Sequence, residues 1–361
     1  MRVGIVGLPN AGKTTLFNAL TRAGAQAASY PFTTVEPNVA VVPVRDERLG
    51  RVAAAVGAAP VVYETLVVHD IAGLVRGAHE GEGLGNRFLA DIRQTDAIVH
   101  VVRAHEDAEV PHPEGSVDPV RDAETVEAEL LLADLEQAER RLERVARQAK
   151  SGERAPVAEE SWLRAVVEAL GAGRPVRSVP TPADAPAALA GLQPLTAKPV
   201  LYVANVADEG PADPPTALEG HAHGGDARTT ALAARIEAEL AELDAAEAET
   251  MRVELGAPGA GIDRLVREAF ALLRLLSFFT ADRGTEARAH AVERGTTAWE
   301  AAGQVHTDMQ RGFVRAEVAP WEELADAGGY GGARDRGTLR LEGRDYEVAD
   351  GDVLRIRFTE G

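Results

Sequence analysis

Eight consecutive residues near the start of the chain, Gly7 to Thr14 (GLPNAGKT), combine glycines, a lysine and a hydroxyl group at fixed spacing. The apolar run Val3 to Val6 precedes them, and a helical pattern from Thr15 to Leu20 follows. Strand, glycine-rich loop and helix in this order place backbone N–H groups and a helix N-terminus around a phosphate. We therefore expect a P-loop, in which Lys13 reaches the β- and γ-phosphates of a nucleotide and Thr14 ligates Mg²⁺. The residues expected to bind nucleotide here are Asn10, Ala11, Gly12, Lys13, Thr14 and Thr15, with Lys13 also catalytic.

Two motifs further along have the composition of the switch regions of a nucleotide hydrolase. Asp70-Ile71-Ala72-Gly73 follows the apolar run Leu66 to His69, which predicts that Asp70 holds a Mg²⁺-bound water and that the Gly73 amide meets the γ-phosphate. Between this motif and the P-loop, Thr34 is placed to close onto Mg²⁺ when the γ-phosphate is present. An Asp-x-x-Gly alone is common, but after a P-loop it becomes specific.

The elements that must position these motifs alternate along the chain. Up to about residue 126, apolar runs alternate with helical stretches, which predicts an α/β fold with a mostly parallel sheet. From about 127, leucines at helical spacing indicate a long amphipathic helix, with a second helix returning at 162–170. The α/β pattern resumes near Lys198, with helices expected at 231–243 and 261–276. Short strands separated by glycine-rich turns begin near Ser277. We expect a nucleotide-binding domain at 1–126 and 196–276, a helical hairpin insertion at 127–195 and a β-rich domain at 277–361.

Composition restricts the class of protein. The chain has 361 residues and a formal net charge of −19. This charge argues against a protein that coats nucleic acid or an anionic membrane. We therefore expect neither a membrane nor a sequence-specific nucleic acid as a partner. A basic stretch from Arg140 to Arg154 is balanced by nearby glutamates and is interpreted as an exposed helix face rather than a docking surface. Cysteine is absent, and neither a signal peptide nor an apolar run of membrane-spanning length is found, so we expect a cytoplasmic protein.

Longer runs around these motifs resemble the Obg-related branch of the translation-factor GTPases, and within it the YchF family of Obg-like ATPases. The matching runs include GLPNAGKTTLFNAL, YPFTTVEPN, LTAKPVLYVANV, LLSFFTADRGTEARA and GRDYEVADGDVLRIRF. The resemblance covers nearly the whole chain and thins between about 151 and 195. It implies that the C-terminal domain is a ubiquitin-like TGS domain. It also implies a ribosome partner, through the large subunit, and weak hydrolysis of ATP in preference to GTP.

The base-reading motif departs from both known patterns. GTPases carry N-K-x-D and the YchF family N-x-x-E, whereas this chain has Asn205-Val206-Ala207-Asp208, followed by Glu209. The missing lysine favours ATP, and the aspartate favours GTP if it points into the pocket. We predict ATP, with Asn205 reading the purine edge, Val206 in the lysine position, and Asp208 or Glu209 turned away. A GTPase of the Obg type is the alternative.

Several further positions bear on hydrolysis or on its control. Thr33 stands where family members often carry a cysteine, which excludes redox control through that thiol, and Leu74 stands where many GTPases place the glutamine that orients water. Without that glutamine, another polar side chain must position the attacking water. His112 in a Pro-rich loop matches a histidine of the family pattern, and a catalytic role and a plain loop role weigh equally for it. His69 and His100 lie within apolar runs and are expected in the core. In switch proteins that lack the glutamine, an asparagine at the position of Asn10 often accompanies a K⁺ ion beside the phosphates. Loop geometry explains the presence of Asn10 equally well.

Three functions remain open for the chain. They are a ribosome-associated regulatory triphosphatase that slowly hydrolyses ATP with Mg²⁺, a nucleotide-gated binding module with little turnover, and a metabolic P-loop kinase. A kinase does not need Thr34 or the Asp70 motif, so it is the weakest of the three. We expect the triphosphatase, and the missing glutamine keeps the binding module as an alternative.

Overall fold

The computed structural model describes residues 1–26, 38–71, 84–209, 213–224, 227–255 and 261–359. These residues form two compact units, one made of Met1–Val42 with Val67–Leu272 and the other of Pro43–Leu66 with Leu273–Gly361. The first unit contains every described residue of the predicted nucleotide site.

A six-stranded sheet in the order β2-β4-β1-β5-β6-β7 organises the first unit. β1 lies between β4 and β5, and all of the pairs from β4 across to β7 are parallel, as the alternating pattern predicts. The strands are β1 (Arg2–Val6), β2 (Val39–Val44), β4 (Glu64–Asp70), β5 (Ala97–Arg103), β6 (Val200–Asn205) and β7 (Arg228–Leu232). Because the strands are parallel, the P-loop after β1 and the loops after β4, β5 and β6 all begin at one edge of the sheet.

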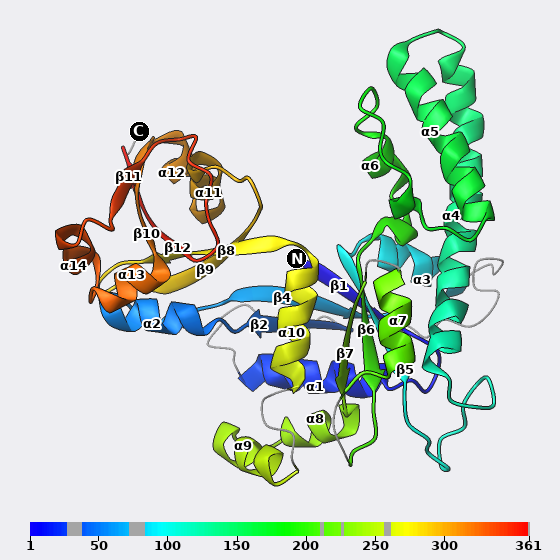
Figure 1. Cartoon of the computed structure of the whole chain (residues 1–361), viewed down its shortest axis with the longest axis horizontal. Coiled ribbons are helices and arrows are strands. Elements are labelled where there is room, and N and C mark those ends of the chain that lie inside the picture. Colours follow the sequence, from blue (N-terminus) through cyan, green and yellow to red (C-terminus); the bar gives the residue numbers. More distant parts are fainter. Residues whose placement is uncertain (27–37, 72–83, 210–212, 225–226, 256–260, 360–361) are drawn as a thin grey trace. The chain divides into compact units, whose positions relative to one another are not determined.

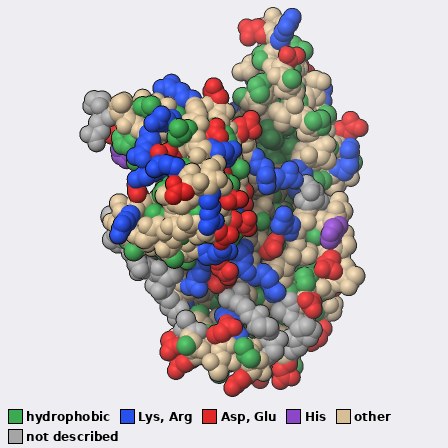
Figure 2. Space-filling view, turned by 60° about the vertical axis from the view of Figure 1, so that its left-hand side comes forward, with side chains coloured by type: hydrophobic (Ala, Val, Ile, Leu, Met, Phe, Trp, Pro, Cys, Tyr) green, Lys and Arg blue, Asp and Glu red, His purple; other side chains and the backbone are tan. Residues whose placement is uncertain are grey.

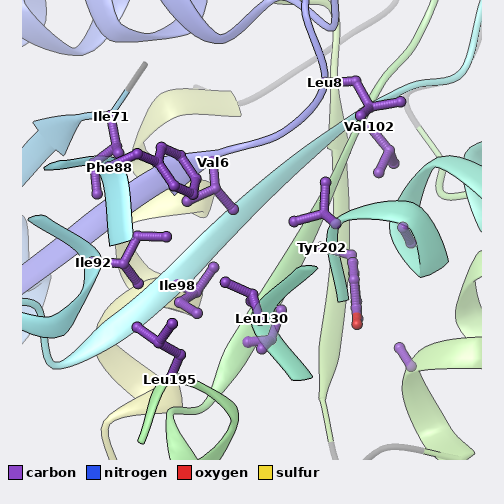
Figure 3. Packing of buried hydrophobic residues seen from close by; sticks show 14 of the residues in the cluster. Val6, Leu8, Ile71, Phe88, Ile92, Ile98, Val102, Leu130, Leu195 and Tyr202 are labelled. Atoms are coloured by element: carbon purple, nitrogen blue, oxygen red, sulfur yellow. The ribbon is translucent and has the colours of Figure 1, made fainter. Parts of the chain in front are cut away.

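Helices cover both faces of this sheet (Figure 1). α1 and α10 pack on one face, and α3, α4 and α7 enclose an apolar core on the other. Figure 3 shows this core, where Val6, Ile98 and Tyr202 of the sheet meet Phe88 and Leu130 of the helices. The helices of the unit are α1 (Lys13–Gln26), α3 (Leu84–Arg93), α4 (Pro119–Ala149), α5 (Arg154–Gly171), α6 (Ala188–Leu192), α7 (Thr216–Gly224), α8 (Ala234–Leu240), α9 (Ala245–Glu254) and α10 (Gly261–Leu272), with short 3-10 helices at Val176–Ser178 and Leu195–Ala197.

The predicted hairpin is formed by α4 and α5, which lie side by side in Figure 1. α4 starts earlier than the periodicity suggested, because the Asp118 side chain accepts the Arg121 N–H as an N-cap and Pro119 fits the first turn. Buried Asp134 accepts both the Leu195 and Thr196 N–H groups at 2.9 and 2.8 Å, which fixes the end of the insertion to α4. In the basic stretch, Arg140 pairs with Glu136 and Arg141 with Glu159, whereas Arg144 and Lys150 are exposed.

The second unit is built on another six-stranded sheet, in the order β11-β10-β12-β8-β9-β3. Antiparallel pairs join β10 to β11, β10 to β12 and β8 to β9, and parallel pairs join β12 to β8 and β3 to β9. Its strands are β3 (Val61–Val62), β8 (Leu275–Ala281), β9 (Ala287–Glu293), β10 (Phe313–Pro320), β11 (Arg340–Glu342) and β12 (Asp352–Phe358). Its helices are α2 (Glu47–Val56), α11 (Ala298–Val305), α12 (Thr307–Arg311), α13 (Trp321–Asp326) and α14 (Tyr330–Asp335).

Residues 43–66 belong to this second unit, whereas the sequence placed them in the nucleotide-binding domain. Leu49, Val52 and Ala53 of α2 are buried with Phe279 and Ala289 of the C-terminal strands, and β3 pairs with β9. An amphipathic helix shows only that it has an apolar face, and not which distant strands will cover it.

Two further boundaries also differ from the sequence expectations. The helix expected to begin at Ala231 begins only at Ala234, because Arg228–Leu232 forms the edge strand β7. The helix expected to run to Leu276 ends at Leu272, and β8 starts at Leu275.

The visible face in Figure 2 carries both acidic and basic side chains. Within the described residues, no helix is long and apolar enough to cross a membrane.

Candidate nucleotide-binding site

Three residues of the P-loop have positive φ angles, a backbone conformation that glycine and asparagine tolerate better than other residues. Gly7 and Gly12 have φ of 150° and 99°, and Asn10 is left-handed at φ 64°, a conformation that asparagine tolerates. A Cβ on Gly7 would lie 2.3 Å from the Val101 carbonyl oxygen, and one on Gly12 would lie 2.3 Å from Nδ2 of Asn205. Both glycines therefore allow the loop to approach β5 and β6 closely.

Lys13 begins α1 and is buried, with its Nζ donating to the Leu8 carbonyl at 2.8 Å. Burial lowers the pKa of Lys13 to about 8, and the nearby carboxylate of Asp70 partly opposes this. The same burial raises the pKa of Asp70, and Lys13 opposes it. Lys13 and Asp70 are thus two opposite charges near each other, the lysine buried and the carboxylate partly buried, in a place where added phosphate and metal charges would interact strongly.

The donors available to a cation here are hard oxygen atoms. The Thr14 hydroxyl lies in the first turn of α1 and the Asp70 carboxylate at the end of β4, the neighbour of β1 in the sheet. Among the described residues, no cluster of three or more His, Cys, Asp or Glu side chains could enclose a metal. One hydroxyl and one carboxylate suit Mg²⁺, which keeps several waters and takes the remaining ligands from substrate phosphates.

Asn205, the last residue of β6, joins the P-loop to the start of α8. Its Nδ2 donates to the Ala11 carbonyl at 3.1 Å, and its Oδ1 accepts the Ala234 N–H at 3.0 Å. The side chain is 7% exposed, and one amide N–H and one Oδ1 lone pair remain for a bound base.

A cavity of about 800 Å³ opens between these elements. Its lining includes Lys13 and Thr14 as well as Val206 and Asp208, so the predicted phosphate-binding and base-reading residues share one space. The Asp208 carboxylate forms an ion pair with Arg235 of α8. The lining residues are Asn10, Gly12, Lys13, Thr14, Thr15, Arg103, His105, Glu106, Asp107, Glu109, Val110, Asn205, Val206, Ala207, Asp208, Ala234 and Arg235.

Arg103, which the sequence analysis did not single out, organises the loop that forms one wall of this cavity. It is 2% exposed and donates to the carbonyl groups of His105, Val110 and Asp107 at 3.0, 2.9 and 3.2 Å. The available signal was an arginine at the end of β5, a strand whose other residues are apolar except His100, because a buried guanidinium needs several acceptors.

The loop after β5 is attached to the P-loop by Asn10, whose Nδ2 donates to the Pro111 carbonyl at 3.0 Å. The next residue, His112, is outside the cavity lining. Its Nδ1 accepts the Glu114 N–H at 3.2 Å, so Nε2 carries the proton and donates to Asp122 Oδ2 at 2.8 Å. The side chains of His112 and Asp122 are 7% and 3% exposed, which makes this a buried contact with the first turns of α4.

Of the two histidines expected in the core, His100 is buried, whereas His69 of β4 is partly exposed. His100 is 2% exposed, and its burial lowers its pKa to about 4, which confirms a neutral core histidine. Thr33, Thr34, Gly73, Leu74 and His79 lie outside the described residues.

The parallel sheet, the loop of left-handed residues before α1 and the cavity define a P-loop NTPase of the GTPase-like class. The family model described as "50S ribosome-binding GTPase" matches residues 2–143, and the model YchF-GTPase_C, described as "Protein of unknown function (DUF933)", matches residues 275–359. Relatives named "Ribosome-binding ATPase YchF" are 44% identical in Bacillus subtilis, 45% in Haemophilus ducreyi and 43% in Escherichia coli O157:H7, each over 99% of both chains. The chain belongs to the YchF family.

Two solved structures are similar in fold. The Schizosaccharomyces pombe YchF GTPase is 30% identical with a TM-score of 0.85, covering 99% of this chain and 97% of that one. A GTP binding protein from Pyrococcus horikoshii OT3 has a TM-score of 0.64 at 21% identity, covering 99% of this chain and 100% of that one. The predicted architecture of a P-loop domain with a helical region and a C-terminal domain is thereby confirmed.

Proposed function

We propose that this protein is a ribosome-binding ATPase, which binds ATP with Mg²⁺ in the cavity between the P-loop and Asn205 and hydrolyses it slowly. The observation that carries the proposal is this cavity, which is lined both by Lys13 and Thr14 of the P-loop and by the base-reading residues Asn205, Val206 and Asp208. Identity of 43–45% over 99% of both chains to proteins named as ribosome-binding ATPases supports the choice of nucleotide and partner.

In this proposal the P-loop binds the phosphates. The backbone N–H groups from Ala11 to Thr15 surround the β-phosphate, and Lys13 leaves the Leu8 carbonyl for the β- and γ-phosphate oxygens. Thr14 would ligate Mg²⁺ and Asp70 would hold a Mg²⁺-bound water. When the γ-phosphate is present, Thr34 would close onto Mg²⁺ and the Gly73 amide would donate to the γ-phosphate. Bound Mg²⁺ supplies positive charge that offsets the charge developing on the phosphoryl oxygens.

The assignment of K⁺ to Asn10 is a separate proposal. The left-handed backbone of Asn10 and its bond to Pro111 give this residue a structural role without an ion. Turnover measured in KCl and in NaCl at equal ionic strength tests the ion directly, since a K⁺-dependent site loses activity in NaCl.

At the base end, the proposal is ATP in preference to GTP. Guanine reading needs a carboxylate free to accept from both N1–H and the N2 amine. Asp208 is instead engaged with Arg235, which supports its being turned away from the base, and Asn205 offers one amide N–H to a purine acceptor. A GTPase of the Obg type is the alternative, and the solved Schizosaccharomyces pombe relative is named a YchF GTPase.

The ribosome is the proposed partner, through its large subunit, which the 50S description of the matching family model supports. The proposed contact surfaces are the helical hairpin of α4 and α5 and the C-terminal unit, which we propose is a TGS domain. A cytoplasmic location follows from this partner.

Single-turnover hydrolysis of ATP and of GTP, each with and without ribosomes, tests the function. The proposal expects ATP hydrolysis that ribosomes accelerate and that Lys13→Ala abolishes. ATP binding without measurable turnover in either condition would instead support a nucleotide-gated binding module. A GTP affinity more than about tenfold above that for ATP would establish the GTPase alternative.

A further inference from the structure

We propose that Arg235 determines the base preference of the site by occupying the Asp208 carboxylate, an inference that rests on the proposed nucleotide-binding function. Arg235 lies outside the motifs on which the function was argued, 27 residues after Asp208 along the chain.

The fold brings the two side chains together at a fixed place. Asp208 follows β6 and Arg235 is the second residue of α8, which follows the neighbouring parallel strand β7. Asn205 pairs with Leu232 in the sheet, and its Oδ1 accepts the Ala234 N–H at 3.0 Å. The first turn of α8 is therefore attached to the same residue that begins the base-reading motif, and Asp208 and Arg235 both line the cavity.

The ion pair changes what Asp208 can recognise. Its guanidinium partner is on Oδ2, and a carboxylate that reads guanine must accept from N1–H and the N2 amine with both oxygens. Adenine has a lone pair at N1, which an unpaired carboxylate repels, and pairing with a guanidinium offsets that repulsion. Arg235 thus acts against GTP and in favour of ATP through one contact.

Exposure sets the size of the effect. The Arg235 side chain is 71% exposed and that of Asp208 is 24% exposed, so water screens the pair and guanine can displace it at a modest cost. We expect removal of Arg235 to raise the ratio of GTP affinity to ATP affinity by about three- to tenfold rather than by orders of magnitude.

Competition binding on the purified full-length chain measures this ratio, in the parent, in Arg235→Ala and in Arg235→Ala with Asp208→Asn. The expected result is a higher ratio in Arg235→Ala, lost when Asp208→Asn removes the carboxylate. Arg228→Ala is the matched control, because Arg228 is half exposed, pairs with Glu268 at 3.0 Å and lies at the opposite end of β7. Its ratio should equal that of the parent.

Two results would overturn the inference. One is an Arg235→Ala ratio within about twofold of the parent, and the other is an equal change for both nucleotides, which indicates a general loss of positive charge. The parent titration separately tests the proposed function, because absence of ATP binding there rejects the ATPase whatever Arg235 does.

Discussion

Nδ2 of Asn205 donates to the carbonyl oxygen of Ala11 at 3.1 Å, so the end of β6 is bonded directly to the P-loop. This contact is buried and is made possible by Gly12, whose missing side chain leaves space for the amide. The two ends of the cavity are thus mechanically coupled, since a displacement of Asn205 changes the phosphate loop as well as the base site.

Gly12→Ala tests this coupling. The new Cβ would lie 2.3 Å from Asn205 Nδ2, and the backbone at φ 99° strains any residue other than glycine. We expect a loss of stability of about 2 to 4 kcal/mol together with a marked loss of nucleotide affinity. Gly173→Ala, at φ 72° with nothing near its Cβ, should show the backbone strain alone in urea unfolding and leave affinity unchanged. Equal behaviour of the two variants would contradict the coupling.

Lys13→Met should separate stability from function. Burial lowers the pKa of Lys13 to about 8, so its charged form at pH 7 destabilises the free protein, and methionine fills the same space without charge. We expect the free energy of unfolding without nucleotide to rise by about 1 to 3 kcal/mol, and nucleotide affinity to fall by about 100-fold or more. Lys198→Met is the control, because Lys198 donates to the Arg93 and Thr95 carbonyls away from the cavity. Unchanged affinity in Lys13→Met would remove the lysine from the site.

The sequence could predict those features that depend on neighbours along the chain. The apolar strands β1, β5 and β6, the P-loop and the helical hairpin all have local patterns in the sequence, although α4 begins at Pro119 rather than near residue 127. The burial of α2 against Phe279 and the pairing of β3 with β9 depend on residues more than 200 positions away, which no local pattern specifies.

The candidate site divides in the same way. The phosphate loop can be predicted from the sequence because its strand, glycines and lysine are consecutive. The ion pair between Asp208 and Arg235 cannot be predicted without knowing how β6 and β7 are aligned in the sheet. β7 was missed because its five residues, RTTAL, adjoin a helical pattern and are too short to show alternation.

The buried histidine of the second unit predicts a pH dependence of stability. His290 stacks on Phe278 and its Nε2 lies 2.9 Å from the Thr280 hydroxyl, and burial lowers its pKa to about 4. Between this value and the ordinary 6.5 the unfolded chain binds a proton that the folded chain does not. Stability therefore falls as pH falls through this window, by about 3 kcal/mol in total for this residue.

Urea unfolding at pH 7 and pH 5 measures the effect. His290→Gln should lose part of the pH slope, about 1.4 kcal/mol per pH unit at most, because one titrating group has been removed. His306→Asn keeps the N-cap of α12 and replaces a side chain that is 63% exposed, so it should retain the parent slope. A His290→Gln slope equal to that of the parent would contradict the prediction, because it would mean that the folded and unfolded chains bind the His290 proton equally over this pH range.

His112 presents the sharpest choice between chemistry and structure. Its two ring nitrogens are engaged by the Glu114 N–H and by the Asp122 carboxylate, while Asn10 bonds to the adjacent Pro111 carbonyl. If His112 orients or activates the attacking water, it must exchange one of these bonds for the water in the nucleotide complex. His112→Ala should then lower the single-turnover rate of hydrolysis by about 100-fold and leave nucleotide affinity nearly unchanged.

A purely structural His112 would give a different pattern, because losing the partner of a buried carboxylate lowers stability by about 1 to 3 kcal/mol without affecting the rate of the folded fraction. Asp122→Asn separates the two, since it weakens the same contact but retains the imidazole. A rate loss confined to His112→Ala assigns the chemistry to the imidazole, whereas equal stability losses with parental rates in both variants leave His112 as a residue that fixes its loop to α4.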